Sequence, residues 1–365
     1  MSERDIKEIK RVVVRGTNWV GDSVMSIPAL RALRRILPTA HITLVGRPGA
    51  RGLFTDSNFI NEYLSYDRRN SFSVLKQISG WRKKNFDLAL LFQNAFEAAL
   101  IPFLAGVPIR FGYATEARTP MLTHPVALPE WRSSKHEVFY YLYLVTALEQ
   151  SLHKTSEICE LDPDVSIEVS PTRREAALEL LQSYGVTAER SIVAICPGST
   201  NSRAKRWPAE RYASLADRLL EDRRQVVVIG AKDELEVTHE VTSRMREQPV
   251  VLTGKTTIDQ LTAVLTCVDL LVTNDTGPAH IGAAVGKPTL VMFGPTNPLT
   301  TRPLSGQAEI IRHPPDCAPC MLRDCPIDHR CMTEISVDEV LDHSQRLLKR
   351  SSFEKTVRSL CDSVA

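Results

Sequence analysis

The chain has no excess of glycine, proline or glutamine: 17 of its 365 residues are glycine and 22 are proline. With 43% hydrophobic and 24% charged residues, the composition excludes a fibrous or intrinsically disordered protein. The formal net charge is only +2, so no overall field attracts nucleic acid or an anionic membrane. We therefore expect a globular protein that binds no nucleic acid and recognises any phosphate group through a local site.

Long apolar runs are also missing. The stretches 98–107 and 138–148 are about ten residues long, whereas a membrane-spanning helix needs about 20. The first residues, MSERDIKEIK, are charged and lack the apolar core of a secretory signal peptide. The sequence therefore predicts a cytoplasmic protein in which both apolar stretches are buried helices.

Two nucleotide-binding motifs are absent. The sequence contains neither G-x-G-x-x-G nor G-x-x-x-x-G-K-[ST], which disfavours a dehydrogenase and a P-loop enzyme. Asp162 and Asp164 are separated by one residue, but Pro163 and the surrounding charges predict a turn in a linker rather than a metal site.

Two series of alternating short apolar runs and helical patterns follow one another along the chain. Uninterrupted apolar runs of this length are typical of strands buried on both faces of a parallel sheet. A helix is expected over 28–36 in the first series and from about 209 in the second. The expected strands lie at 12–14, 41–45, 86–92, 192–195, 225–229, 270–273 and 289–293. The pattern predicts two α/β domains with a boundary near 165–185.

One candidate ligand site follows the strand expected at 270–273, because such folds bind ligands at the carboxyl ends of strands. This strand runs into Asn274-Asp275-Thr276-Gly277, and a helix is expected from about Pro278. Thr276 is either a structural N-cap or a ligand contact, and the pattern does not separate the two. For His280, in the first helical turn, a ligand contact is favoured over a core histidine.

A second candidate anion site is the loop 198–208, between the strand expected at 192–195 and the following helix. Hydroxyls and cations at such a position bind anions. Of the three cations in this loop, we favour Lys205 as the ligand contact. For Arg203 and Arg206 we favour an ordinary solvated position. The polar residues concerned are Ser199, Thr200, Asn201, Arg203, Lys205 and Arg206.

Asp22 lies in the segment GTNWVGDSVMSIPAL, at the end of the loop GTNWVGD that we expect before the first helix. A carboxylate at a helix N-terminus is favourable on structural grounds alone. Alternatively, the flanking Gly16 and Gly21 allow a substrate to approach the carboxylate closely.

Three segments together resemble a known family. They are GTNWVGDSVMSIPALRALRR, PGSTNSRAKRWPAERYASLADRLL and LTGKTTIDQLTAVLTCVDLLVTNDTGPAHIGAAVGKPTLVMFGPTNP. In this order, from about residue 11 to about 345, the chain resembles the bacterial ADP-heptose:lipopolysaccharide heptosyltransferases of glycosyltransferase family 9, most closely those of type II. The resemblance implies an α/β protein of the GT-B fold, with two Rossmann-like domains whose parallel sheets face across a cleft. The implied parts are an acceptor-binding domain over 1–170, a nucleotide-sugar-binding domain over 185–345 and a helical tail over 346–365.

The resemblance also implies a reaction and the residues that perform it. The reaction is an inverting, metal-independent transfer of L-glycero-D-manno-heptose from ADP-heptose to the first heptose of the lipopolysaccharide inner core. Asp22 matches the catalytic base and Lys205 the lysine that meets the diphosphate; Asp233 or Glu234 matches the ribose contact, and 252–256 the adenine-binding segment. Further implied contacts are Ser199, Thr200, Asp275, Thr276, Gly277 and His280 for the donor, and Thr17, Asn18, Gly21 and Asn94 for the acceptor.

The implied acceptor is lipid A–Kdo–heptose, so we expect a monomeric cytoplasmic enzyme peripheral to the inner membrane. The arginines that are candidates for acceptor phosphates are Arg47, Arg51, Arg68, Arg69, Arg110 and Arg118. The sequence leaves open a heptosyltransferase of type I or III and a transferase that uses another nucleotide sugar. A non-catalytic nucleotide-sugar binder is disfavoured by the presence of Asp22, and a sugar-nucleotide epimerase is the third alternative.

Four of the eight cysteines are clustered near the C-terminus, in the pattern Cys317-x2-Cys320-x4-Cys325-x5-Cys331. His313 and His329 are nearby. This pattern resembles a set of metal ligands, although its spacing is not that of a standard zinc ribbon. It leaves open a structural zinc ion, free thiols and a redox-dependent disulfide. Catalysis itself is expected to need no cofactor.

Overall fold

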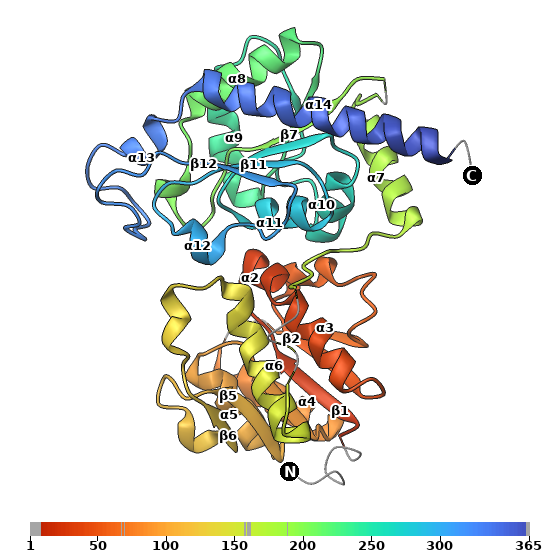
Figure 1. The fold of residues 1–365 in the computed structure, drawn as a ribbon, viewed down its shortest axis with the longest axis vertical. Helices are drawn as coiled ribbons and strands as arrows, with labels where there is room; N and C mark the ends of the chain where they lie inside the picture. The colour runs from red at the N-terminus through yellow and green to blue at the C-terminus, as the bar shows by residue number, and fades with distance from the viewer. Residues whose placement is uncertain are drawn as a thin grey trace. The chain divides into compact units, whose positions relative to one another are not determined.

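The computed structural model describes residues 9–362, apart from 67, 69, 157, 159–161 and 188, with backbone alone for 71 and 351–362. The chain divides into two compact units, Met1–Val165 and Ser166–Ala365 (Figure 1). Within the described residues, no helix has both the length and the apolar character needed to cross a membrane.

The first unit is built on a parallel six-stranded sheet of order β3-β2-β1-β4-β5-β6. Its strands are β1 (Arg11–Arg15), β2 (His41–Gly46), β3 (Glu62–Ser65), β4 (Leu88–Leu91), β5 (Ile109–Tyr113) and β6 (His124–Val126). Its α-helices are α2 (Val20–Met25), α3 (Ile27–Ile36), α4 (Ser71–Lys84), α5 (Phe96–Ala105) and α6 (Glu137–His153), and its 3-10 helices are η1 (Pro48–Leu53), η2 (Thr119–Met121) and η3 (Glu130–Ser133). The prediction that the two apolar stretches form buried helices is confirmed by α5 and α6, which have extensive buried faces.

The segment before α3 differs from the sequence expectation. Val20–Met25 is helical, so Gly21 and Asp22 lie in α2 rather than in a loop. Hydrogen bonds from Ser23 N to Trp19 O and from Ser26 N to Asp22 O, both 2.9 Å, close its turns. Ser26 then separates α2 from α3. A six-residue helix is too short to produce a clear apolar period, which is why the pattern missed it.

The second unit contains another parallel six-stranded sheet, of order β12-β11-β10-β7-β8-β9. In Figure 1, α8 and α14 lie on one side of this sheet, and α10 and α11 lie on the other. The strands are β7 (Ile192–Cys196), β8 (Gln225–Val228), β9 (Val250–Val251), β10 (Leu270–Asn274), β11 (Thr289–Met292) and β12 (Ala308–Ile311). The helices are α7 (Pro171–Ser183), η5 (Arg203–Lys205), α8 (Ala209–Glu221), η6 (Lys232–Glu234), α9 (Leu235–Thr242), α10 (Ile258–Leu265), α11 (Gly277–Ala284), α12 (Pro298–Thr301), α13 (Arg330–Thr333) and α14 (Val337–Asp362).

The segment expected as a linker contains a helix. Residues 162–170 form neither helix nor strand, but α7 begins at Pro171, where the fixed φ of proline suits the first helical position. The charges that suggested a linker, such as Arg174 and Glu175, lie in the first turns of α7.

The two sheets share one connectivity, and it decides where a site can form. In each sheet the strand order reverses once, between β1 and β4 in the first and between β7 and β10 in the second. At such a switch point, the segments after the two neighbouring strands leave in opposite directions and open a space at the carboxyl edge of the sheet. The candidate residues of each unit follow these strands: Asp22 after β1, Asn94 after β4, Lys205 after β7 and Asp275 after β10.

Candidate functional site

Lys205 and Asp275 form an ion pair at the switch point of the second unit. Lys205 Nζ lies 2.8 Å from Asp275 Oδ2 and 3.2 Å from the Asp275 backbone oxygen. The Asp275 side chain is only 5% exposed, whereas that of Lys205 is 26% exposed. A lysine has three N–H donors, and these bonds use two of them. The pair therefore holds the ammonium group in one place and leaves a donor for an anionic ligand.

Asp275 has a second partner that the sequence did not indicate. Thr296 donates a hydrogen bond from its Oγ1 to Asp275 Oδ2 at 2.7 Å, and Thr296 is buried. It follows β11, the next strand along the sheet. Three loops thus meet at one carboxylate.

Asn274 joins the loop after β7 to the end of β10. Its Oδ1 accepts hydrogen bonds from Trp207 N at 3.0 Å and Tyr212 OH at 3.1 Å. Its Nδ2 donates to the backbone oxygens of Pro197 at 2.9 Å and Gly198 at 3.1 Å. The Asn274 side chain is fully buried, so the position of the loop that carries Lys205 depends on these bonds. The sequence contained no signal for this role, because all four partners are distant in the chain.

Thr276 and His280 lie at the start of α11. Thr276 occupies the N-cap position by its backbone, yet its side chain makes no capping bond. Its Oγ1 instead lies 3.3 Å from both the Asn274 backbone oxygen and Thr273 Oγ1. His280 is buried in the first turn. Gly277 is the first residue of this helix, whose positive dipole end lies at the carboxyl edge of the sheet and favours an anion.

Glu234 lies in a niche between two glycines. A Cβ at Gly198 would lie 2.3 Å from its Cδ, and one at Gly230 would lie 3.0 Å from its Oε2. Ala231 N donates to Oε2 at 2.8 Å, and Thr200 Oγ1 donates to Oε1 at 3.3 Å. Burial of the side chain outweighs these bonds and raises the pKa of Glu234 above its usual range. Asp233, the other candidate for this role, is exposed.

The cations beside Lys205 have different surroundings. Arg203 pairs with Asp324 at 2.6 Å, and both side chains are exposed, which agrees with the solvated loop favoured for Arg203. Arg206 differs from that expectation, since it is partly buried and its Nη2 donates to the Ser199 backbone oxygen at 3.1 Å. Ser199 itself is buried.

In the first unit, the half-buried Asp22 lies on α2, a helix that packs against α6. Burial raises the pKa of Tyr141 well above its usual range, and the charge of Asp22 raises it further, which places this carboxylate near Tyr141. On the neighbouring segment, Trp19 is 48% exposed and the Arg47 guanidinium lies 5.5 Å from its ring centroid. Trp19 is the N-cap residue of α2, so this aromatic ring and its cation lie beside the start of the helix that carries Asp22.

Two of the four implied acceptor residues, Thr17 and Asn94, have hydrogen-bond partners within the protein. Thr17 is buried with its Oγ1 2.9 Å from Ser23 Oγ. Asn18 and Gly21 are half-buried beside it. Asn94 follows β4 and donates from Nδ2 to Tyr140 OH at 2.7 Å.

Gly16 has a packing role that the sequence could not show. A Cβ there would lie 2.9 Å from Leu44 Cδ1 and 3.3 Å from the Val45 backbone oxygen. This close approach to β2 requires the glycine, so Gly16 needs no substrate to explain it.

Two of the six candidate arginines have structural roles. Arg118 is fully buried, donates to Tyr113 O at 2.8 Å and Asn94 Oδ1 at 3.0 Å, and burial lowers its pKa to about 10. Arg110 donates from Nε to Met121 O at 2.6 Å. Arg68 pairs with Glu97 at 2.9 Å, and Arg69 lies outside the described residues. Arg47 and Arg51, beside and within η1, therefore remain the candidates for binding a phosphate group of the acceptor.

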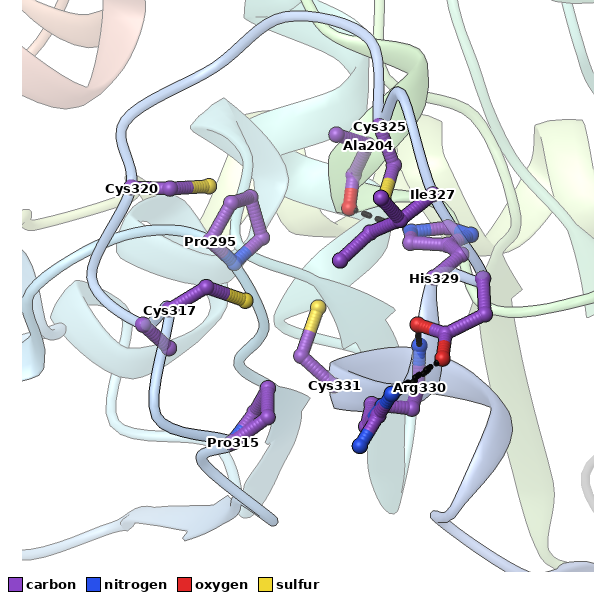
Figure 2. A pocket seen from close by; sticks show the side chains of 12 residues that line it. Ala204, Pro295, Pro315, Cys317, Cys320, Cys325, Ile327, His329, Arg330 and Cys331 are labelled. Carbon is purple, nitrogen blue, oxygen red and sulfur yellow. Dashed lines mark hydrogen bonds and ion pairs between the residues drawn. The ribbon is translucent and has the colours of Figure 1, made fainter.

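The four clustered cysteines line one pocket, and Figure 2 shows their sulfur atoms directed into it. Burial raises the pKa of Cys331 to about 11, and the charges of the other three thiols add to this shift. Among the described residues, no three His, Cys, Asp or Glu side chains are grouped so that they could hold a metal ion. The nearby histidines have other partners: His313 Nε2 lies 2.9 Å from Glu339 Oε2, and His329 Nε2 lies 2.7 Å from the Ala204 backbone oxygen.

The chain is similar to known proteins over most of its length. Residues 74–330 match the family model described as glycosyltransferase family 9 (heptosyltransferase). Lipopolysaccharide heptosyltransferase 2 of Escherichia coli K12 is 28% identical over 310 residues, which cover 83% of this chain and 88% of that protein. Lipooligosaccharide heptosyltransferase 2 of Campylobacter jejuni serotype O:2 is 27% identical over 349 residues, 93% of this chain and 99% of that protein.

Solved structures give the same result. The structure of the E. coli ADP-heptose lipopolysaccharide heptosyltransferase II superposes with a TM-score of 0.79 at 27% identity, covering 94% of this chain and 99% of that one. A glycosyl transferase family 9 protein from Veillonella parvula superposes with a TM-score of 0.80 at 25% identity, covering 93% and 97%.

Proposed function

Because the chain belongs to glycosyltransferase family 9, the heptosyltransferase family, and is a glycosyltransferase of the GT-B fold, we propose that it transfers heptose from ADP-heptose to the lipopolysaccharide inner core. The observation that carries this proposal is the Lys205–Asp275 pair at the switch point of the second sheet. A cation held there, beside a helix N-terminus, suits a nucleoside diphosphate. The names of the relatives, which are heptosyltransferases 2, support extension of the first heptose by a second.

On the donor side, we propose that the second unit, over 185–345, holds ADP-heptose. Lys205 meets the diphosphate together with backbone amides at Thr276 and Gly277, and His280 contacts the donor from the first turn of α11. As the sugar leaves, negative charge grows on the departing ADP, and these groups stabilise it without reorganisation. Glu234 is our choice for the ribose contact, because it lies between the ends of β7 and β8, whereas Asp233 is exposed.

On the acceptor side, we propose that the first unit, over 1–170, binds the acceptor and that Asp22 is the general base. A carboxylate with an ordinary pKa of about 3.9 is a weak base for a sugar hydroxyl. The proton therefore leaves late, as the hydroxyl oxygen bonds to the anomeric carbon and becomes more acidic. The hydroxyl attacks from the face opposite ADP, so the anomeric configuration inverts. No step in this scheme needs a metal ion.

The finer assignments follow from this proposal. The acceptor is lipid A–Kdo–heptose, reached by peripheral association with the cytoplasmic face of the inner membrane, and the enzyme acts as a monomer. For the clustered cysteines, a structural zinc ion, free thiols and a redox-dependent disulfide stay open, and none of these takes part in the transfer.

Transfer assays with purified protein test the proposal. ADP-heptose is supplied with truncated lipopolysaccharide cores that end in Kdo, in one heptose or in two heptoses, and the products are identified by mass spectrometry. We expect extension only of the core that ends in one heptose. Extension of the Kdo-terminated core instead would identify a type I activity, and transfer only from another nucleotide sugar would overturn the donor assignment. Conversion of the nucleotide sugar without any acceptor would favour an epimerase.

A further inference from the structure

Two neighbouring helices of the first unit, α4 and α5, carry exposed apolar side chains together with cations on their outer side, here called the α4–α5 face. We propose that this face docks the protein on the surface of a bilayer that contains anionic phospholipids. The proposal rests on the peripheral membrane association given above as part of the proposed function, and it names the surface that makes the contact. Its first tests measure binding to lipid and need no transfer reaction.

The two helices pack against each other and against the sheet. Ile78 and Trp81 of α4 and Ala99 of α5 are buried in one core cluster. At the C-terminal ends, Arg82 Nη2 donates a hydrogen bond to Leu104 O at 2.7 Å. α3 and α6 pack against each other instead, and right-handed crossovers put that pair on the opposite face of the sheet. α4 and α5 thus form one outer layer of the first unit.

Most of the exposed large hydrophobic side chains of the first unit lie on this layer. Of the seven among its described residues, five are on α4 or α5 and none is on α3 or α6. The most exposed are Phe72 at 73% and Leu75 at 61%, and the others are Phe96, Phe103 and Leu104. The core cluster is formed without them. Apolar side chains gathered in this way mark a site of interaction, whereas single ones are common on any surface.

The outer side of α4 is also basic. The helix contains four cations and no acidic residue. Three of the cations, Lys76, Arg82 and Lys83, are exposed. Lys76 follows Phe72 by four residues and Lys83 follows Lys76 by seven, so these three side chains lie on one side of the helix. Cations and apolar groups are therefore interleaved on the same surface.

The carboxylate of α5 is already paired. Glu97, the only charged residue of that helix, lies 2.9 Å from Arg68 Nε and accepts a hydrogen bond from Tyr66 OH at 2.6 Å. At the other end of α5, the Arg110 guanidinium lies 5.5 Å from the ring centroid of Phe103. The α4–α5 face is therefore positively charged, although the chain as a whole has a formal net charge of only +2.

This combination complements an anionic bilayer. Cations near such a surface are attracted to the phosphate groups of the lipids, and aromatic and leucine side chains enter the boundary between headgroups and acyl chains. The long stems of lysine and arginine can cover apolar surface while their charged ends reach the headgroups. A purely electrostatic partner such as a nucleic acid would use the cations and leave Leu75 and Leu104 without an apolar contact.

The face ends where the acceptor is expected. α4 follows β3 and α5 follows β4, so both helices begin at the carboxyl edge of the first sheet. Phe72 and Phe96 lie in their first turns. α2, which carries Asp22, follows β1 and begins at the same edge. A bilayer along the α4–α5 face would therefore hold a lipid-linked acceptor beside the edge that carries the proposed base.

The first experiment measures cosedimentation of the full-length protein with vesicles of phosphatidylethanolamine and phosphatidylglycerol, and with vesicles of phosphatidylcholine alone. We expect about tenfold tighter binding to the anionic vesicles, and this preference should decrease as salt is added. Lys83→Glu should weaken the binding about tenfold, because it reverses one charge of the face. Lys349→Glu, at an exposed position of α14 in the second unit, makes the same change of charge and should bind like the wild type.

The second experiment tests the apolar side chains. The double variant Phe72→Ser, Leu75→Ser should lower the vesicle affinity about tenfold and keep the melting temperature of the wild type, because both side chains are exposed. The control is Leu178→Ser, at a 39% exposed position of α7, which should bind vesicles like the wild type. In transfer assays, the double variant should keep the wild-type kcat/KM for a deacylated acceptor in solution and lose about tenfold for the acceptor in vesicles.

Wild-type protein that binds neither kind of vesicle would overturn the proposal. Equal weakening by Lys83→Glu and Lys349→Glu would overturn it too, since the attraction would then not be local, and so would unchanged vesicle affinity in the folded double variant. A lipid-free wild type that forms a dimer, which the double variant splits into monomers, would make the face a contact between copies of the chain instead. If no heptose is transferred to any acceptor, the proposed function fails, while vesicle binding still decides whether the face docks on lipid.

Discussion

Lys205 Nζ lies 2.8 Å from Asp275 Oδ2, so the cation that follows β7 is tied to the carboxylate that ends β10. This contact spans the switch point of the second sheet. Because Asp275 is almost wholly buried, its charge needs a partner in the absence of substrate, and Lys205 supplies it. The pair thus serves stability and fixes the ammonium group where a diphosphate is expected.

Lys205→Ala is expected to lower kcat/KM for ADP-heptose by about 10- to 100-fold, which corresponds to the loss of a hydrogen bond to a charged group. The acceptor KM should change little. His280→Ala should likewise lower kcat/KM for ADP-heptose and leave the acceptor KM nearly unchanged. Steady-state kinetics with each substrate varied in turn measures this. The exposed Arg203→Ala serves as a control for charge in the same loop. A defect confined to the acceptor KM would refute the donor assignment.

Asp22→Ala is expected to lower turnover by about 100-fold or more while ADP binding stays close to that of the wild type. The reason is that the base acts on the acceptor hydroxyl and not on the nucleotide. Single-turnover rates and calorimetry with ADP measure the two quantities separately. Turnover near the wild-type level in this variant would exclude Asp22 as the base.

Glu234→Gln is expected to raise the melting temperature at pH 7 to 8. Burial raises the pKa of Glu234, so the folded protein favours the protonated carboxyl. A carboxyl whose pKa is higher in the folded than in the unfolded chain stabilises the fold when the pH is below its pKa in the unfolded chain. This stabilisation is lost as the pH rises through its pKa in the folded protein. The advantage of the variant should therefore shrink as the pH falls toward about 4. The control is Asp233→Asn at the exposed neighbour, which should show no such trend; an advantage that does not vary with pH would contradict the prediction.

Asn274→Ala is expected to lower the free energy of unfolding by about 1 to 3 kcal/mol, because Trp207 N and Tyr212 OH lose their buried acceptor. Denaturant titration measures the change. Asn201→Ala, at an exposed position of the neighbouring loop, is the control and should be nearly neutral. If the two substitutions lowered the free energy of unfolding equally, the bridging role assigned to Asn274 would be wrong.

Addition of a chelator is expected to leave the initial transfer rate unchanged on the timescale of the assay, since no proposed step uses a metal ion. Slow loss of folding stability on long exposure is compatible with a structural zinc ion. A prompt loss of activity that Mg²⁺ or Mn²⁺ restores would show that catalysis needs a metal after all.

The sequence predicted the central strands well and the edges poorly. The runs at 12–14, 192–195 and 270–273 became β1, β7 and β10, because strands buried on both faces are apolar without interruption. The strands β3, β5, β6, β9 and β12 were not predicted; β6 and β9, with the sequences HPV and VV, are too short to form a pattern. The order of strand, polar loop and helix was also readable, and it located Lys205, Asp275 and Asp22 before any distance was known.

What the sequence by itself determined is therefore local: which segments are strands, and which polar residues follow them. Only the tertiary structure decided which of these residues meet. Thr296 reaches Asp275, Asn274 joins two loops, and Ala204 contacts His329. Each of these contacts joins residues that are far apart in the chain, so no short-range pattern encodes it. The strand order creates them, because parallel strands bring the loops after β7, β10 and β11 to one edge of the sheet.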